Sequence, residues 1–159
     1  MHVFKDSKGR SWEVVLDVRQ VRRVRAALGI DLANVIALSK DGSVDVGVVD
    51  RIANDPCLLA DVLWVLVEGQ AKEDGVTDEA FGASLAGDSI EEAARAFLDE
   101  LVDFFPGAKR LFLKKAVELS RKYAGETEAV LKEALESPEL ERAVAAATST
   151  SSSASSRGS

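Results

Sequence analysis

The chain has 159 residues, 47% of them hydrophobic, so it has enough length and apolar character to bury one core of its own. Its longest strongly apolar stretch, residues 58 to 67, contains Asp61 and is far shorter than the roughly 20 residues of a membrane-spanning helix, so we expect no membrane association. The N-terminus lacks a long apolar segment followed by a cleavage site, which indicates a cytoplasmic protein. A formal net charge of −7 disfavours nonspecific binding to nucleic acid and favours protein partners.

The opening residues predict a β-hairpin. Residues 1 to 16 read as two short strands joined by a turn that contains Gly9. Because an isolated hairpin is marginally stable in water, we expect Phe4, Trp12 and Val14 to pack one of its faces onto the helices that follow.

A first helix is predicted directly after the hairpin. Valine and leucine recur at helical spacing between Asp17, which can cap the free amides, and Gly29, which ends the run. Residues 30 to 38 are apolar and compatible with either helix or strand, and the sequence Asp41-Gly42-Ser43 breaks them.

The middle of the chain favours two further helices. Residues 44 to 53 favour a short helix, although part of this segment also has strand character. Asp55-Pro56 is a clearer start signal, because aspartate can cap a helix and proline is tolerated in its first turn. We expect a buried helix from there through Glu68.

Two helices of different length are predicted next. Thr77 can cap a short helix that carries Phe81, and Gly87 closes it. Ser89 and Glu92 then have the spacing of a capping box and open the most amphipathic helix of the sequence, which runs to residue 105.

The last third of the chain is predicted to be helical in pieces. Pro106-Gly107 interrupts the preceding pattern, and a new helix is expected to end at Gly125. Residues 127 to 136 are predicted to form a further helical stretch, and Ser137-Pro138 can start one more short helix.

These elements define a mainly α fold. A short N-terminal β-hairpin at residues 1 to 16 precedes a compact helical domain at residues 17 to 136 and a short helix at residues 137 to 147. Residues 148 to 159 form a low-complexity serine-rich tail with nothing to bury, which we predict to be disordered.

The residue types that carry catalysis are scarce. His2 is the sole histidine and Cys57 is the sole cysteine. We expect the Cys57 thiol to be buried. No glycine-rich phosphate loop lies between a strand and a helix. The carboxylates of Asp99, Glu100 and Asp103 are expected on the solvated side of an amphipathic helix. We therefore predict no catalytic, cofactor-binding or metal-binding residues, and a protein that is not an enzyme and uses no cofactor.

Arginines gather on the first predicted helix. Arg19, Arg22 and Arg23 lie close to one face, and Arg25 points away from it. This cluster can bind nucleic acid, or it can be an exposed face that docks an acidic protein. We favour the second interpretation because the overall charge is acidic and no helix-turn-helix frame is present.

An aromatic stripe runs along the predicted amphipathic helix. Phe97, Leu101, Phe104 and Phe105 have the spacing of a core face, and exposure of several of them would instead create a groove for a partner. We therefore carry these four, with Arg19, Arg22 and Arg23, as candidate partner-binding residues.

Charge is divided sharply between two neighbouring helices. Residues 74 to 103 hold nine acidic side chains and only Arg95, whereas residues 109 to 122 are strongly basic. The two helices could pair antiparallel through these charges, or the division could mark a surface for ordered self-association.

Four stretches between residues 3 and 125 occur in the same order along the chain as the corresponding features of a known protein family. They are Phe4, Gly9-Arg10 and Trp12; Val21-Arg22 and Leu28-Gly29-Ile30-Asp31-Leu32; Asp55-Pro56 through Leu63-Trp64; and Val76-Thr77-Asp78-Glu79-Ala80-Phe81 leading through Leu85 and Gly87 to Phe97, Leu98, Leu101 and Phe104-Phe105. With its short β start, small helical body and polar C-terminus, the chain resembles the tail assembly chaperones of long-tailed, siphovirus-type bacteriophages.

The resemblance implies a phage or prophage protein of the bacterial host cytoplasm. Such a chaperone coats and solubilises the tape measure protein, helps to recruit tail tube protein, and commonly has a longer frameshifted form. Two alternatives stay open: a small structural virion protein of the tail or head-tail region, and a nucleic-acid-binding regulator that uses the arginine cluster.

Overall fold

We describe a computed structural model that covers the backbone of residues 1 to 155 and the side chains of residues 1 to 139 and 141 to 148. The chain divides into two compact units, Met1–Lys115 and Ala116–Ser159. Helices account for 69% of the residues, and a short two-stranded hairpin opens the chain, which confirms the predicted mainly α class with an N-terminal hairpin.

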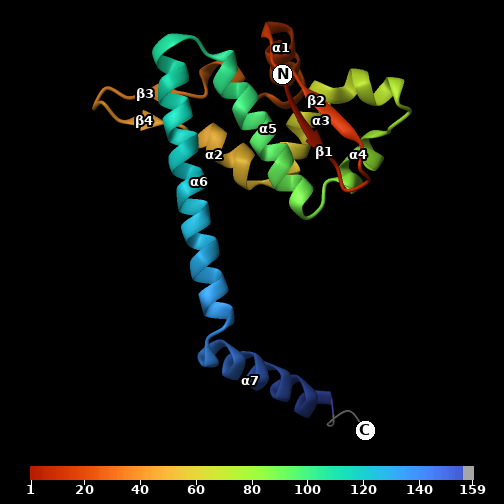
Figure 1. The fold of residues 1–159 in the computed structure, drawn as a ribbon, viewed down its shortest axis with the longest axis vertical. Helices are drawn as coiled ribbons and strands as arrows, with labels where there is room; N and C mark the ends of the chain where they lie inside the picture. The colour runs from red at the N-terminus through yellow and green to blue at the C-terminus, as the bar shows by residue number, and fades with distance from the viewer. Residues whose placement is uncertain (156–159) are drawn as a thin grey trace. The chain divides into compact units, whose positions relative to one another are not determined.

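The hairpin has the predicted position. Strands β1 (His2–Lys5) and β2 (Ser11–Val14) pair antiparallel, with Phe4 opposite Trp12. Phe4, Trp12 and Val14 are all buried, because alternate residues of a strand point to one face and this face is covered by helices. Strand β1 contacts helix α5 (Asp88–Phe104) and β2 contacts helix α3 (Pro56–Glu73), as Figure 1 shows.

Helix α3 lies at the centre of the first unit. It contacts helix α1 (Val18–Leu28), helix α2 (Gly47–Asn54), helix α4 (Asp78–Ser84), helix α5 and strand β2. The side-chain amide of Gln70 clamps β2 to α3, since it donates to the carbonyl of Ser11 at 2.8 Å and its oxygen accepts from the amide of Glu13 at 3.1 Å. The helix runs five residues beyond the predicted end at Glu68.

The predicted caps are confirmed where a local signal was strong. The Asp17 carboxylate accepts from the amide of Gln20 at the start of α1, and Gly29 ends that helix with a φ of 69°, which an L side chain rarely adopts. Asp55 caps α3 and Thr77 caps α4 in the same way.

The ambiguous segment before α3 contains both kinds of structure. A short 3₁₀ helix (Leu32–Asn34) is followed by strand β3 (Ala37–Leu38), which pairs with strand β4 (Val44–Asp45) across the turn at residues 41 to 43. The predicted helix at residues 44 to 53 is therefore wrong in its first residues. Its start moves to Gly47 because the turn holds Val44 in register with Leu38.

The predicted capping box at Ser89 is also wrong. Helix α5 begins one residue earlier, after Gly87, whose φ of 59° turns the chain, so Ser89 lies inside the first turn. Its hydroxyl accepts from the amide of Ala86 at 2.9 Å and donates to the Ala86 carbonyl at 2.7 Å, which fixes the loop between α4 and α5.

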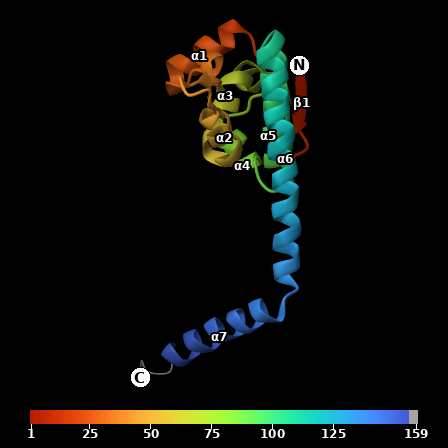
Figure 2. The same cartoon turned by 90° about the vertical axis from the view of Figure 1, so that its left-hand side faces the viewer.

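The C-terminal helices are longer than predicted. Helix α6 (Gly107–Leu135) continues through Gly125, so the predicted helix end at that residue is wrong. Figure 2 shows α6 as one uninterrupted helix. Gly125 has no positive φ and continues the helix like any other residue. Helix α7 (Pro138–Ser155) begins where Ser137-Pro138 predicts. The predicted disordered tail is only partly described, because residues 156 to 159 and the side chains from residue 149 onward lie outside the described residues.

Candidate functional site

The arginines of α1 are engaged in ion pairs within the chain. Arg19 bonds the carboxylate of Asp17 at 2.8 Å and Arg23 bonds Glu68 of α3 at 2.6 Å, although both arginines are exposed. The first contact raises the pKa of Arg19 and lowers the pKa of Asp17. Arg22 is exposed and has no ion pair among the residues described.

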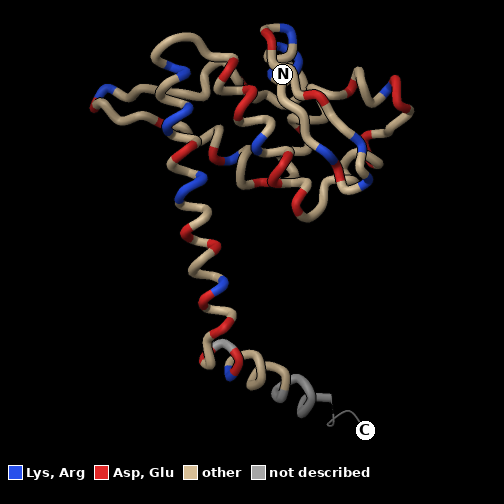
Figure 3. Tube along the Cα trace, viewed as in Figure 1, with Lys and Arg blue, Asp and Glu red and all other residues tan. Residues whose placement is uncertain are grey.

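Acidic and basic side chains alternate around this region rather than forming a basic face. Arg25 pairs with Asp31 at 2.6 Å, and this hydrogen bond lowers the pKa of that carboxyl. Figure 3 shows Lys and Arg positions interspersed with Asp and Glu positions over the first unit. Local pairing therefore neutralises most of the arginine cluster, for which the sequence left nucleic-acid binding open and favoured the docking of an acidic protein.

Most of the aromatic stripe of α5 is core. Phe97, Leu101 and Phe105 are buried, so their prediction as partner-binding residues is wrong and the alternative core interpretation is correct. The reason is that strand β1 covers this face of α5. Phe104 is half-buried and packs edge-on against Phe105, with ring centroids 5.3 Å apart.

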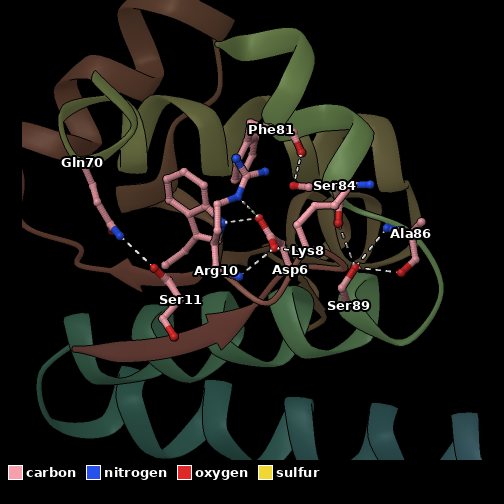
Figure 4. Close-up of polar contacts among 10 residues, drawn as sticks. Asp6, Lys8, Arg10, Ser11, Gln70, Phe81, Ser84, Ala86 and Ser89 are labelled. Atoms are coloured by element: carbon pink, nitrogen blue, oxygen red, sulfur yellow. Dashed lines mark hydrogen bonds and ion pairs between the residues drawn. The ribbon is translucent and has the colours of Figure 1, made fainter. Parts of the chain in front are cut away.

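A buried carboxylate that the sequence reasoning missed organises the hairpin turn. The side chain of Asp6 is fully buried and accepts from the amides of Lys8 and Arg10, from the Arg10 guanidinium at 2.8 Å and from the Trp12 indole at 2.9 Å, as Figure 4 shows for the labelled residues. Burial raises the pKa of Asp6, but these hydrogen bonds outweigh it and lower the pKa to about 2. The available signal was an aspartate two residues before a turn amide, as in an Asx turn.

This carboxylate has a structural task. By holding the indole nitrogen it seats Trp12 against Phe81 of α4, with ring centroids 5.1 Å apart at an angle of 86°. The Ser7 amide bonds the carbonyl of Ser84, so the same turn also holds the end of α4. The hairpin turn therefore sets the position of α4 against α3.

An apolar groove opens where α3, α4 and the start of α5 meet. Its volume is about 310 Å³, at the lower end of the usual range for ligand pockets. Buried Leu59 and Phe81 contribute to its lining, and half-buried Ala60, Leu85 and Ile90 line it further. The polar members of its lining are Cys57, Asp61 and Asp78, all exposed. We call this the α3–α4–α5 groove.

Cys57 is exposed, in contrast to the expected buried thiol. It is the second residue of α3, and its amide donates to the capping carboxylate of Asp55 at 3.0 Å. The side chains of this first turn project from the core because the packing of α3 begins at Leu59. The thiol therefore stands beside the groove, where a reagent can reach it.

Polar side chains gather at the junction of β1 and α5. The His2 ring lies 2.9 Å from Asp103, whose pKa this hydrogen bond lowers, and 3.8 Å from Glu100. Glu100 is buried, contrary to the expected solvated position, and accepts from the amide of Leu16 at 2.9 Å. Over the described part of the chain, no group of three or more His, Cys, Asp or Glu side chains is placed to hold a metal ion.

Comparison with protein-family models, with curated proteins and with solved structures finds no match to this chain. Within residues 1 to 155, no helix combines the length and apolar character needed to cross a membrane.

Proposed function

We propose that this chain is a tail assembly chaperone of a phage or prophage. In the host cytoplasm it binds and solubilises the tape measure protein and helps to recruit tail tube subunits. It acts by reversible binding, with no catalytic step and no cofactor. The family resemblance of residues 3 to 125 suggests the partner, and the α3–α4–α5 groove is the observation that supports a binding role.

The groove suits an amphipathic helix. Large apolar side chains at positions i and i+3 or i+4 of a partner helix can enter it over Leu59 and Phe81. Exposed Asp61 and Asp78 would then favour partner helices that carry lysine or arginine beside the apolar face. A tape measure chain offers long apolar helical surface before the tail tube encloses it, and such surface aggregates unless it is covered.

The size of the groove explains why many copies would act together. A volume of about 310 Å³ accommodates few side chains, so each contact is weak and reversible. Many copies bound along one tape measure chain would mask it as a whole and leave when tube subunits displace them. Multivalent occupation thus gives coverage without a permanent complex.

Co-expression with the neighbouring tape measure gene tests the proposal. We expect the tape measure protein to be soluble and to copurify with this chain, and we expect Leu85→Asp and Ile90→Asp, which charge the groove wall, to reduce recovery at least tenfold. Leu38→Asp, at a side chain 75% exposed, is the matched control and should bind like the parent. A soluble tape measure protein and normal-length tails made without this chain would contradict the proposal.

The two alternatives are separated by simple measurements. A structural virion protein would be present in purified particles at subunit stoichiometry, whereas a chaperone would be largely absent from their mass spectrum. A nucleic-acid-binding regulator would bind at low salt with an affinity that falls steeply as salt rises. The ion pairs of Arg19, Arg23 and Arg25 count against that regulator, because their charges already have carboxylate partners.

A further inference from the structure

Helix α6 carries an exposed apolar stripe. Phe112, Leu119, Tyr123 and Val130 are 40%, 42%, 63% and 64% exposed, respectively. At 3.6 residues per turn these four lie within an arc of about 40° and extend over about 27 Å of the helix. We call them the α6 stripe. A stripe of this length on one helix face has the geometry of a helix–helix seam.

Charged residues border one edge of the α6 stripe in a definite order. Lys115 and Lys122 are seven residues apart and lie in the first half of the helix, and Glu126 and Glu133 are seven residues apart in the second half. A separation of seven residues is about two turns, so all four side chains follow the same edge. Within the described part of the chain, none of the four has an ion-pair partner.

The order is symmetric about Ala124. Lys115 and Glu133 are each nine residues from it, and Lys122 and Glu126 are each two residues from it. If two copies of α6 lie antiparallel with Ala124 at the centre, each lysine comes level with a glutamate of the other copy. A parallel pair would instead place the lysine halves of both copies side by side, which like-charge repulsion disfavours.

The wider charge distribution agrees with this orientation. Residues 107 to 122 carry six basic side chains and one acidic side chain, and residues 123 to 136 carry four acidic side chains and one basic side chain. An antiparallel partner therefore presents a basic half to each acidic half over the whole helix.

We propose that α6 binds the α6 of a second copy of this chain in antiparallel orientation. The α6 stripe forms the seam, with Leu119 of one copy alongside Val130 of the other and the two Tyr123 rings meeting near the centre. The edge lysines and glutamates set the direction and the register. The inference does not depend on the proposed function, but it would join two α3–α4–α5 grooves in one particle and so add avidity for a long partner.

Charge reversal on the full-length chain tests the pairing. We expect sedimentation of the parent to show a concentration-dependent dimer. The double variants K115E/K122E, with an acidic edge throughout, and E126K/E133K, with a basic edge throughout, should each self-associate at least tenfold more weakly, and an equal mixture of the two should form a heterodimer. K114E/R121E makes the same charge change at the same spacing on another face of α6, away from the proposed seam, and should weaken self-association far less than either edge variant.

Disulfide trapping tests the orientation. In a Cys57→Ser background, a mixture of the Ala116→Cys and Val130→Cys variants should form a cross-linked heterodimer, whereas Ala116→Cys alone should not cross-link to itself. A chain that stays monomeric at all concentrations, or edge reversals without effect in variants whose circular dichroism matches the parent, would overturn the proposal. Self-linking of Ala116→Cys would overturn the antiparallel arrangement. None of these measurements requires a tape measure protein, so their outcome is independent of whether the proposed chaperone function is correct.

Discussion

At the scale of single residues, Asp6 illustrates how a charge can be buried at low cost. Its carboxylate gives up water and receives four hydrogen bonds in exchange, two from backbone amides and two from side chains. Because these donors come from the turn and from Trp12, the carboxylate couples the backbone of the hairpin to the aromatic packing between β2 and α4.

Removing this charge should destabilise the first unit. We expect Asp6→Asn to lower the free energy of unfolding by about 2 kcal/mol, because the pKa of Asp6 lies at about 2 instead of 3.8 and one pKa unit corresponds to about 1.4 kcal/mol. Since the folded pKa is the lower one, this stabilisation is complete above pH 3.8 and disappears as the pH falls toward 2. Urea unfolding at several pH values measures it.

The control for this experiment is Asp61→Asn, which changes an exposed carboxylate. Its stability should follow that of the parent within a few tenths of a kcal/mol at every pH. A difference between the parent and Asp6→Asn that is the same at pH 6 and at pH 2.5 would show that the charge of Asp6 does not contribute in the way described.

At the scale of elements, local chemistry sets where helices begin and tertiary contacts set how far they run. Asp17, Asp55 and Thr77 each bond an amide two or three residues ahead, so the sequence alone could predict these caps. Gly125 was a misleading signal, since glycine ends a helix only when the chain turns there with a positive φ. In α6 the chain does not turn at that position.

A substitution at Gly125 distinguishes a helix that continues through this residue from one that ends there. We expect Gly125→Ala to stabilise α6 by about 0.5 to 1 kcal/mol, because an added Cβ meets no atom within 4 Å and alanine loses less backbone entropy than glycine in a helix. Amide hydrogen exchange across residues 120 to 130 would slow accordingly.

Gly29→Ala provides the opposite case for comparison. Gly29 ends α1 with a φ of 69°, so we expect alanine there to destabilise the chain by about 1 kcal/mol although its Cβ also meets nothing. Faster exchange in α6 after Gly125→Ala would show that the helix breaks at that residue, as the sequence suggested.

At the scale of the whole molecule, the exposed thiol beside the groove reports on binding. We expect Cys57 to react with a maleimide in the free protein at a rate close to that of the unfolded chain, because its side chain is exposed. If the tape measure protein occupies the α3–α4–α5 groove, its presence should slow the reaction at least tenfold. Mass spectrometry of timed samples measures both rates.

A control variant tests whether the slower reaction of Cys57 is due to a partner in the α3–α4–α5 groove. In the Leu85→Asp variant, which alters the groove wall, the thiol should stay reactive when the tape measure protein is added. Binding that leaves Cys57 equally reactive in the parent chain would place the partner on another surface.

The sequence by itself determined the mainly α class, the opening hairpin and the starts of α1, α3 and α4. These features depend on side chains that bond or pack within a few residues of themselves, so the pattern of residue types is sufficient to predict them. The alternation of Phe4, Trp12 and Val14 likewise predicted which face of the hairpin is buried, and that prediction is confirmed.

Only the tertiary structure decided which polar and aromatic side chains the core takes in. Glu100 is buried because a donor distant in sequence, the amide of Leu16, reaches it once β1 and β2 cover the helices. Asp6 is buried together with Trp12, whose indole bonds it from the facing strand of the same hairpin. Phe97 is withdrawn from any partner by the same packing. The α3–α4–α5 groove exists because three helices meet around Phe81, and contacts between distant segments leave no periodic mark on the sequence of any one of them.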